Sequence, residues 1–341
     1  MNGFPDGPAA QGPTERARPL MGRGVVWENH CCIDFADVET GLAGLARYRR
    51  AGVDAVHVNI GAGGEGLEDM VRSAASMRRW LRQRPGEYVF ALTVADIWQA
   101  KTEGKLAVSF NIEGAHAIGA HVDLVELFYE LGVRWMALVY NRRNALGSGC
   151  HDADDTGVTA AGRRLLAEMD RVGMIKDVAH AGYRTAMDVC VGSAVPVTIS
   201  HSNPRALTDH PRCVPDDLMR ECARTGGVLG ISGIGIFLGN NDPSTPQLVR
   251  SIDYAVEVMG IEHVGIGTDY VFMDPATLTN LLRSEPHLWP RGFAYEDNIR
   301  MAQPEQFPEL AEALLRRGYS DDALEKLLGG NFLRVASQVW K

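Results

Sequence analysis

A (β/α)8 TIM barrel, an α/β fold, is the architecture that the sequence predicts. From residue 25 onward, short runs of β-forming residues alternate with stretches of helical periodicity. Strand–helix alternation of this kind builds a parallel sheet, and eight such units close naturally into a barrel. The chain has 341 residues, 45% of them hydrophobic, which suffices for one barrel core. Periodicity alone leaves an open doubly wound sheet as the alternative.

The eight expected strands are residues 25–33, 53–60, 106–112, 134–140, 173–179, 194–200, 227–232 and 263–268. Residues such as Leu165, Met169 and Val172 mark an intervening helix by their spacing. The long stretch 274–305, with Pro and Trp, is expected to cover the barrel mouth. The last helix, at about 321–338, is expected to pack against the barrel exterior.

The chain is expected to contain one catalytic barrel domain. Residues 1–23 mix Pro, Gly and charged residues and are expected to form a disordered N-terminal tail. Residues 24–341 contain no internal repeat and no linker that would divide them. We therefore predict a single (β/α)8 barrel over residues 24–341.

Composition excludes several classes of partner. The net charge of −9 argues against nucleic-acid binding, because phosphate contacts need a basic surface. No apolar run approaches the roughly 20 residues of a membrane span, and the N-terminus lacks the apolar core of a signal peptide. A cytoplasmic protein without membrane attachment is therefore expected. The six cysteines follow no framework spacing and are expected to be mostly buried, reduced residues.

The most informative polar residues stand at the ends of the expected strands. In a parallel barrel these ends share one rim, where barrel enzymes carry their active sites. Imidazoles and carboxylates that converge there form a metal-ligand set suited to zinc. The sequence thus predicts a barrel of the metal-dependent hydrolase type. The candidate residues, in chain order, are His30, Cys32, Glu113, His180, His201 and Asp269.

Strand parity separates the first of these residues from their neighbours. His30 and Cys32 are two positions apart, so their side chains share a face, and Cys31 points the other way into the core. His57 lies in mid-strand and is also expected in the core. A lone histidine at a strand end is usually a structural residue; three of them together with Glu113 indicate a metal site.

A glycine-rich loop offers a competing interpretation. Residues 61–66 read Gly-Ala-Gly-Gly-Glu-Gly, which matches the G-x-G-x-x-G pattern of dinucleotide-binding loops. However, Glu65, Glu68 and Asp69 would repel a pyrophosphate, and a bound dinucleotide would leave the rim histidines unexplained. We interpret this segment as a flexible loop between a strand and a helix.

Longer motifs resemble the membrane dipeptidase (renal dipeptidase-like) family of metallopeptidases, in particular its bacterial branch. The resemblance extends from about residue 25 to residue 338, and the order and spacing of its motifs are specific. They are Ile112-Glu113-Gly114, GVTAAGRRLLAEMDRVGMIKDVAH ending at His180, SHSNPRAL around His201, HPRCVPDD around Arg212, GIGTDY around Asp269, and GGNFLRV near the C-terminus.

The resemblance implies a homodimeric, zinc-dependent dipeptidase with two metal ions, often tolerant of a D-residue at the C-terminal position of the substrate. It implies that Glu113 bridges both ions, that His180 and His201 complete one site, and that His30 belongs to the other. Asp269 would handle the catalytic proton. Arg212 would hold the substrate carboxylate.

Three positions depart from the family pattern. Cys32 replaces the aspartate that usually follows the first-strand histidine; its thiolate is a zinc ligand but lowers the Lewis acidity of the ion. Asp34, which has the same parity, is the alternative ligand. Tyr140 replaces a histidine that contacts substrate in many members, and Cys213 replaces the asparagine that usually follows the arginine.

These assignments predict amide hydrolysis of a dipeptide or small amide by a metal-activated hydroxide. Asp269 would transfer the proton, and Tyr140 would donate a hydrogen bond to the carbonyl or the oxyanion. One alternative is another metal-dependent amidohydrolase or lactone-opening enzyme on the same barrel, since specificity lies in the loops. The other is a binding or scaffold protein whose metal site has decayed at Cys32.

Overall fold

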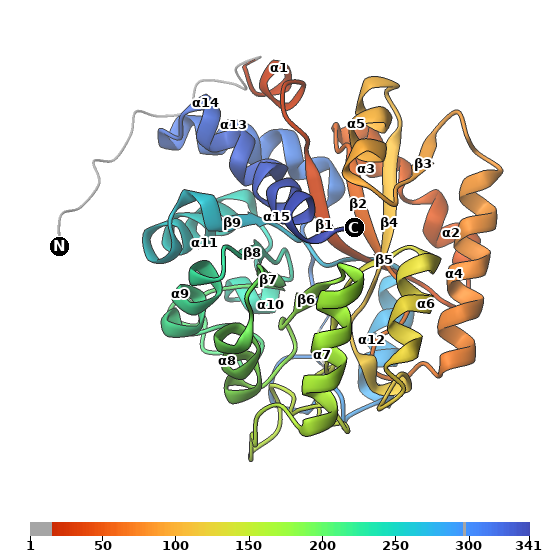
Figure 1. The fold of residues 1–341 in the computed structure, drawn as a ribbon. Helices are drawn as coiled ribbons and strands as arrows, with labels where there is room; N and C mark the ends of the chain where they lie inside the picture. The colour runs from red at the N-terminus through yellow and green to blue at the C-terminus, as the bar shows by residue number, and fades with distance from the viewer. Residues whose placement is uncertain (1–15, 296–297) are drawn as a thin grey trace.

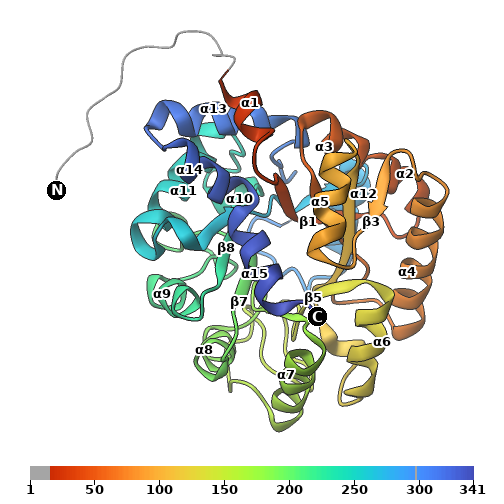
Figure 2. The same ribbon diagram turned by 45° about the horizontal axis from the view of Figure 1, so that its top comes forward.

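A ring of parallel strands lies at the centre of the molecule, and helices surround it (Figures 1 and 2). The computed structural model describes residues 16–295 and 298–341. The predicted (β/α)8 barrel is confirmed. Its strands are β1 (Trp27–Ile33), β2 (Ala55–Asn59), β3 (Tyr88–Phe90), β4 (Leu106–Ile112), β5 (Val133–Ala137), β6 (Ile175–Asp177), β7 (Val197–Ser202), β8 (Val228–Ile231), β9 (Val264–Ile266) and β10 (Tyr270–Phe272).

The sheet order is β10-β1-β2-β4-β5-β6-β7-β8-β9, and every neighbouring pair is parallel. β9 and β10 are two parts of one strand interrupted by residues 267–269, so the ring closes between β8 and β1 with eight positions. β3 lies off this ring and pairs with the first half of β4. β3 and β10, which have three residues each, are not among the expected strands.

Amphipathic helices cover the outside of the ring. α7 is typical: Thr159 caps its first turn, it buries Leu165 and Met169, and it ends at Gly173 with φ of 87°. None of the described helices has the length and hydropathy to cross a membrane. The helices are α1 (Ala17–Met21), α2 (Val38–Ala43), α3 (Ala46–Ala51), α4 (Leu67–Arg82), α5 (Val94–Thr102), α6 (Asp123–Leu131), α7 (Ala160–Val172), α8 (Tyr183–Gly192), α9 (Asp216–Arg224), α10 (Gly235–Leu238), α11 (Thr245–Met259), α12 (Pro275–Ser284), α13 (Phe307–Arg317), α14 (Asp321–Glu325) and α15 (Asn331–Val339).

The C-terminal helix closes the amino end of the barrel, rather than packing on its exterior as expected. α15 lies across the ring in Figure 2. Its Phe332, Val335 and Val339 form one buried cluster with residues that begin strands, including Trp27 and Ala55. The apolar first residues of the strands would otherwise face water at this end, which explains why the helix lies there.

The predicted N-terminal tail is only partly within the described residues. Residues 1–15 lie outside them. Of the remainder, Ala17–Met21 forms α1, which packs against α13 and buries Ala17, Leu20 and Met21. For this stretch the prediction of disorder is wrong, because its three apolar side chains share one face and find a partner helix.

Gly230 on β8 tests the packing of the barrel wall. A Cβ at this position would lie 2.1 Å from the Ser200 carbonyl oxygen on β7, a backbone atom that cannot easily move. We expect Gly230→Ala to lower the free energy of unfolding by about 1–3 kcal/mol, measured by urea denaturation. The control is Gly86→Ala, where the added Cβ meets nothing within 4 Å; its effect should stay below about 1 kcal/mol. Equal effects of the two substitutions would contradict this account.

Candidate active site

The predicted metal-site residues meet at the carboxyl end of the barrel. Because the strands are parallel, their last residues share one rim, opposite the end that α15 covers. His30, Glu113, His180 and His201 are buried there. The set comprises His30 and Cys32 on β1, Glu113 after β4, His180 after β6, His201 on β7 and Asp269 between β9 and β10.

The Glu113 carboxylate is the centre of this cluster. Its Oε1 lies 3.1 Å from His30 Nε2, 3.0 Å from His180 Nε2 and 3.2 Å from His201 Nε2. Its Oε2 accepts a hydrogen bond of 2.6 Å from Asn59 Nδ2. Ring nitrogens from three strands therefore converge on one oxygen of a carboxylate whose other oxygen is already hydrogen-bonded.

Hydrogen bonds on the far side of the rings orient two of the histidines. His180 Nδ1 lies 2.8 Å from Asn141 Oδ1, and it must be the donor because an amide oxygen only accepts. The lone pair of His180 Nε2 is therefore directed at Glu113. His201 Nδ1 is hydrogen-bonded to Ser200 Oγ at 2.8 Å, a hydroxyl that can donate or accept. Partners of this kind are typical behind metal-ligating histidines.

Burial and neighbouring charges hold His180, His201 and Glu113 in the protonation states that bind metal. Burial, assisted by the Arg212 guanidinium, lowers the pKa of His180 to about 3. Burial and His30 lower the pKa of His201 well below its ordinary value. Burial alone would raise the pKa of Glu113, but the surrounding histidines hold it well below its usual range. Two neutral imidazoles, His180 and His201, thus face a carboxylate anion, a combination that a divalent cation satisfies. His30 differs: burial lowers its pKa, but the charge of Glu113 outweighs burial and raises it, so a bound cation would have to displace its proton.

Asp269 lies in the interruption between β9 and β10, with a left-handed φ of 61°. Its N–H donates to the His30 carbonyl at 3.1 Å, and its Oδ1 is 3.5 Å from His30 Nε2. Burial raises the pKa of Asp269 to about 7, with the Glu113 charge adding to the increase. Such a carboxyl exchanges its proton near neutral pH, as a general base or acid requires.

Two buried carboxylates that the sequence analysis did not identify position the cluster from below. Glu28 Oε1 accepts from the N–H groups of His30 at 3.1 Å and Thr268 at 2.7 Å. Asp177 accepts from the N–H groups of Ala179 at 3.0 Å and Ser200 at 2.7 Å. Thr268, Ala179 and Ser200 directly precede site residues, so each carboxylate ties together the backbone at two of them. One signal in the sequence could have identified Glu28 and Asp177: each is a charged residue within a strand that is expected to be buried.

Cys32 lies at the edge of the cluster. Its Sγ is 3.5 Å from His30 Nε2 and 3.7 Å from Glu113 Oε2. Burial and the adjacent carboxylates raise the pKa of its thiol well above the ordinary value. Asp34, the alternative ligand, instead accepts a hydrogen bond from the Ala36 N–H at 2.8 Å. It is not among the described residues that line the cavity above the Glu113 cluster.

Arg212 and Tyr140 both contact His180. The buried Arg212 guanidinium donates to the carbonyls of Ala179 and His201, and its Nη2 is 3.3 Å from His180 Nε2. Among the described residues, no carboxylate lies within 4.0 Å of it. The Tyr140 ring stacks on the His180 ring with centroids 4.2 Å apart. The structure therefore brings both predicted substrate-binding residues to the cluster.

The cluster opens into a cavity of about 150 Å³. Cys32, Glu113, His180, Arg212 and Asp269 form its polar floor. Its roof is apolar and comes from α12 and the segment that follows, within the stretch expected to cover the mouth. The roof residues are Met273, Leu278, Leu281, Leu282, Trp289, Ile299 and Met301.

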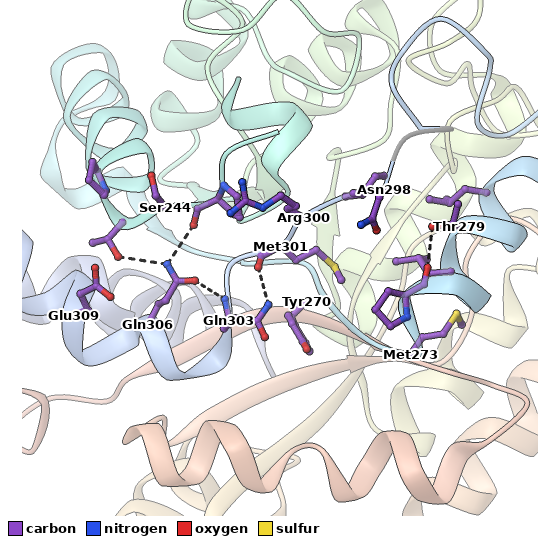
Figure 3. Close-up of a pocket in the computed structure, with 17 residues that line it drawn as sticks. Ser244, Tyr270, Met273, Thr279, Asn298, Arg300, Met301, Gln303, Gln306 and Glu309 are labelled. Carbon is purple, nitrogen blue, oxygen red and sulfur yellow. Dashed lines mark hydrogen bonds between the residues drawn. The ribbon is translucent and has the colours of Figure 1, made fainter. Parts of the chain in front are cut away.

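A larger cavity, of about 650 Å³, lies behind this roof (Figure 3). The two cavities share Met273, Leu278, Leu282, Ile299 and Met301 as a dividing wall. Its charged lining residues, within the part of the chain that the structure describes, are Arg300 and Glu309, and its lining contains no histidine or cysteine. Several of the residues predicted to bind metal or to transfer a proton therefore line the smaller cavity, and none of them lines the larger one.

The donor set fits a zinc centre. His30, Glu113, His201 and Asp269 each offer one ligand atom, and these atoms lie within 4.8 Å of one another. Imidazole nitrogen and carboxylate oxygen are zinc ligands, and the Cys32 thiol loses its proton when it binds such a metal. The residues present therefore suit a divalent zinc ion, with Cys32 as the unusual member of the set.

The sequence profile of the membrane dipeptidase family, peptidase family M19, matches residues 28–284 and 295–341. The chain belongs to this family. The resemblance predicted from the motifs is thereby confirmed, and family membership supports a metal-dependent dipeptidase activity.

Similar sequences include a bacterial protein and fungal dipeptidases. An uncharacterized protein in the pqqA 5′ region of Klebsiella pneumoniae is 30% identical over 289 residues, which cover 82% of this chain and 98% of that protein. The dipeptidase aclJ of Aspergillus oryzae is 30% identical over 280 residues, or 80% of this chain and 61% of that protein. The chain thus spans about three fifths of this fungal relative.

Solved structures agree with the fold. An amidohydrolase from Pseudomonas aeruginosa superposes with a TM-score of 0.87 at 27% identity, over 95% of this chain and 99% of that chain. A metallopeptidase from Rhodobacter sphaeroides, solved with a phosphinate mimic of the dipeptide L-Ala-D-Ala, has a TM-score of 0.77 at 21% identity, over 93% and 99% of the two chains. The second comparison supports the barrel alone.

Removal of one imidazole tests the metal centre. We expect His180→Ala to weaken zinc binding by more than the roughly 10-fold to 100-fold typical of losing an outer partner, because a direct donor is lost. The measurement is the zinc content per chain after dialysis, by elemental analysis. His121→Ala removes an exposed histidine and should leave the zinc content unchanged. Equal zinc in both variants would rule out His180 as a ligand.

Proposed function

We propose that this protein is a zinc-dependent dipeptidase that also accepts a D-residue at the C-terminal position of the dipeptide. The observation that carries the proposal is Arg212, a buried guanidinium beside the Glu113 cluster with no carboxylate partner among the described residues. A buried cation needs an anion, and the free carboxylate of a dipeptide supplies one. The names of the fungal relatives and the L-Ala-D-Ala mimic bound to the Rhodobacter protein support this substrate class.

We propose two zinc ions at the centre. Glu113, His180 and His201 would hold one ion, and His30 with Cys32 would hold the other, with Glu113 shared between them. When bound, zinc lowers the pKa of water toward about 7 and polarises a carbonyl, so that hydroxide is available for amide hydrolysis at neutral pH.

The protein's own residues supply the proton transfer and the substrate contacts. Asp269, whose Oδ1 lies 3.5 Å from His30 Nε2, would accept a proton from the attacking water and return it to the leaving amine as the C–N bond breaks. Burial and the Glu113 charge raise the pKa of Tyr140 well above its ordinary value, so its hydroxyl keeps the proton and donates to the carbonyl oxygen. Arg212 holds the carboxylate.

The cavity restricts the substrate. A space of about 150 Å³ beneath the apolar roof favours a small substrate such as a dipeptide over longer peptides. The apolar side chains of the roof would lower the polarity beside the reacting groups, which strengthens electrostatic interactions.

A substrate panel tests the proposed function. The zinc-loaded protein should hydrolyse L-Ala-L-Ala and L-Ala-D-Ala in preference to simple lactones. Asp269→Asn should keep its zinc but lose activity by at least about 100-fold, because the proton acceptor is gone. Asp322→Asn, at an exposed residue of α14, serves as the control. Lactone hydrolysis without dipeptide hydrolysis would replace the proposal, and full activity of Asp269→Asn would refute the proton role.

Replacement of Arg212 tests the carboxylate contact. Arg212→Met should raise KM for dipeptides by about 10-fold to 100-fold with a smaller change in kcat, since a charge-assisted contact to the substrate is lost. Arg212→Lys retains the positive charge, so it shows whether an effect of Arg212→Met comes from loss of that charge or from loss of folding. Arg164→Met, at an exposed residue of α7, is the control. An unchanged KM in both Arg212 variants would count against the contact.

A further inference from the structure

The glycine-rich loop after β2 contributes a carboxylate to the active-site cavity. Glu65, the acidic residue within Gly61–Gly66, is half-buried and lines the same cavity as Glu113, Arg212 and Asp269. The dipeptidase chemistry described above gives this residue no role. Its position suggests one, because the cavity wall is otherwise largely apolar on the side of the roof.

The loop is held firmly enough to position the Glu65 side chain. Glu65 Oε2 accepts from the Ala62 N–H at 2.7 Å, and the Glu65 carbonyl lies 2.8 Å from His116 Nε2. The loop also packs directly on the site: a Cβ at Gly63 would lie 2.6 Å from Tyr140 Cδ1. Glycine at this position thus permits the loop to approach the ring that stacks on His180.

Glu65 is also available for a ligand, unlike the other carboxylates of the cavity. Glu113 faces three imidazoles and Asn59, and Asp269 lies 3.5 Å from His30 Nε2. Within residues 16–295 and 298–341, no Lys, Arg or His nitrogen lies within 4.0 Å of the Glu65 carboxylate. Among the described residues, its carboxylate accepts a hydrogen bond from the neutral Ala62 N–H group, which leaves the other oxygen for a cationic partner.

The loops that carry Glu65 and Arg212 leave the ring on opposite sides. Glu65 follows β2 and Arg212 follows β7, and three ring positions separate these strands in either direction around the ring. Glu65, Arg212 and the Glu113 cluster line the same cavity. This cavity therefore receives a carboxylate and a guanidinium from loops that leave opposite sides of the ring, with the reacting centre at its floor.

We propose that Glu65 binds the α-ammonium group of the substrate and makes the enzyme selective for peptides with a free amino terminus. The inference rests on the proposed dipeptidase function. A dipeptide carries an ammonium group at one end, a carboxylate at the other and the scissile amide between them, which matches the order Glu65, Glu113 cluster, Arg212. N-acyl amino acids lack the ammonium group and lose this contact, so Glu65 separates two substrate classes that the barrel alone does not distinguish.

A pair of substrates that differ only in the amino group tests this role. Alanyl-alanine has the α-ammonium group, and N-propionyl-alanine lacks it but keeps the amide and the carboxylate. The zinc-loaded wild-type protein should prefer alanyl-alanine in kcat/KM by about 10-fold to 100-fold, the range for one charge-assisted hydrogen bond. Glu65→Gln should abolish most of this preference by raising KM for alanyl-alanine, while hydrolysis of N-propionyl-alanine stays within about 2-fold.

The variant and its control both replace a glutamate with glutamine, one within the glycine-rich loop and one just after it. Glutamine keeps an acceptor oxygen for the Ala62 N–H, so the loop is expected to hold its conformation, and an unchanged melting temperature and zinc content check this. Glu68→Gln removes a nearby exposed carboxylate that pairs with Arg72 and should leave the preference intact.

The outcomes separate this inference from the proposed function. A wild-type protein that hydrolyses neither dipeptides nor N-propionyl-alanine overturns both. A wild-type protein that prefers alanyl-alanine, with the same preference in Glu65→Gln, overturns the inference alone and assigns the ammonium group to another carboxylate. Equal wild-type activity on the two substrates also overturns the inference, since no residue then selects for the amino group.

Discussion

The contact between one carboxylate and three imidazoles is the constraint on which the rest of this active site depends. Glu113 is buried, and a buried charge is costly unless it is paired and hydrogen-bonded. The histidines around its Oε1 and Asn59 on its Oε2 provide this compensation. Each partner comes from a different strand or strand end, so the contact requires a closed ring with the observed register. The site therefore forms only when the barrel closes with this register.

A second layer of buried acids maintains this geometry. Glu28 and Asp177 accept from backbone N–H groups at or directly before the site residues, and so fix the backbone from which the ligands project. Burial raises the pKa of Glu28 to about 7 and of Asp177 to about 6. Holding two further carboxyl groups inside the barrel has a desolvation cost, and pre-organisation of the centre is the compensating gain.

The two ends of the barrel have different roles: the amino end contributes to stability, and the carboxyl end carries the candidate active site. At the amino end, α15 seals an apolar layer built from the first residues of the strands. At the carboxyl end, polar groups collect under an apolar roof from α12 and the following segment. A carboxylate and a guanidinium line the cavity at this end, from the loops after β2 and β7. This asymmetry is the usual arrangement of barrel enzymes, in which loops carry specificity and the ring carries stability.

The sequence by itself determined the fold class and the family, and strand periodicity with the parity of parallel strands predicts that His30, Glu113, His180, His201 and Asp269 meet at one rim. Only the tertiary structure decided which groups surround them. Asn59, Asn141 and Ser200 are ordinary polar residues in the sequence, and their roles depend on distances between strands. The sequence predicts a flexible loop around Glu65, whereas the tertiary structure brings this residue into the lining of the cavity that also contains Arg212. Local patterns encode the face on which a side chain lies, whereas partners far apart in the chain are set by ring closure and packing, which no local pattern contains.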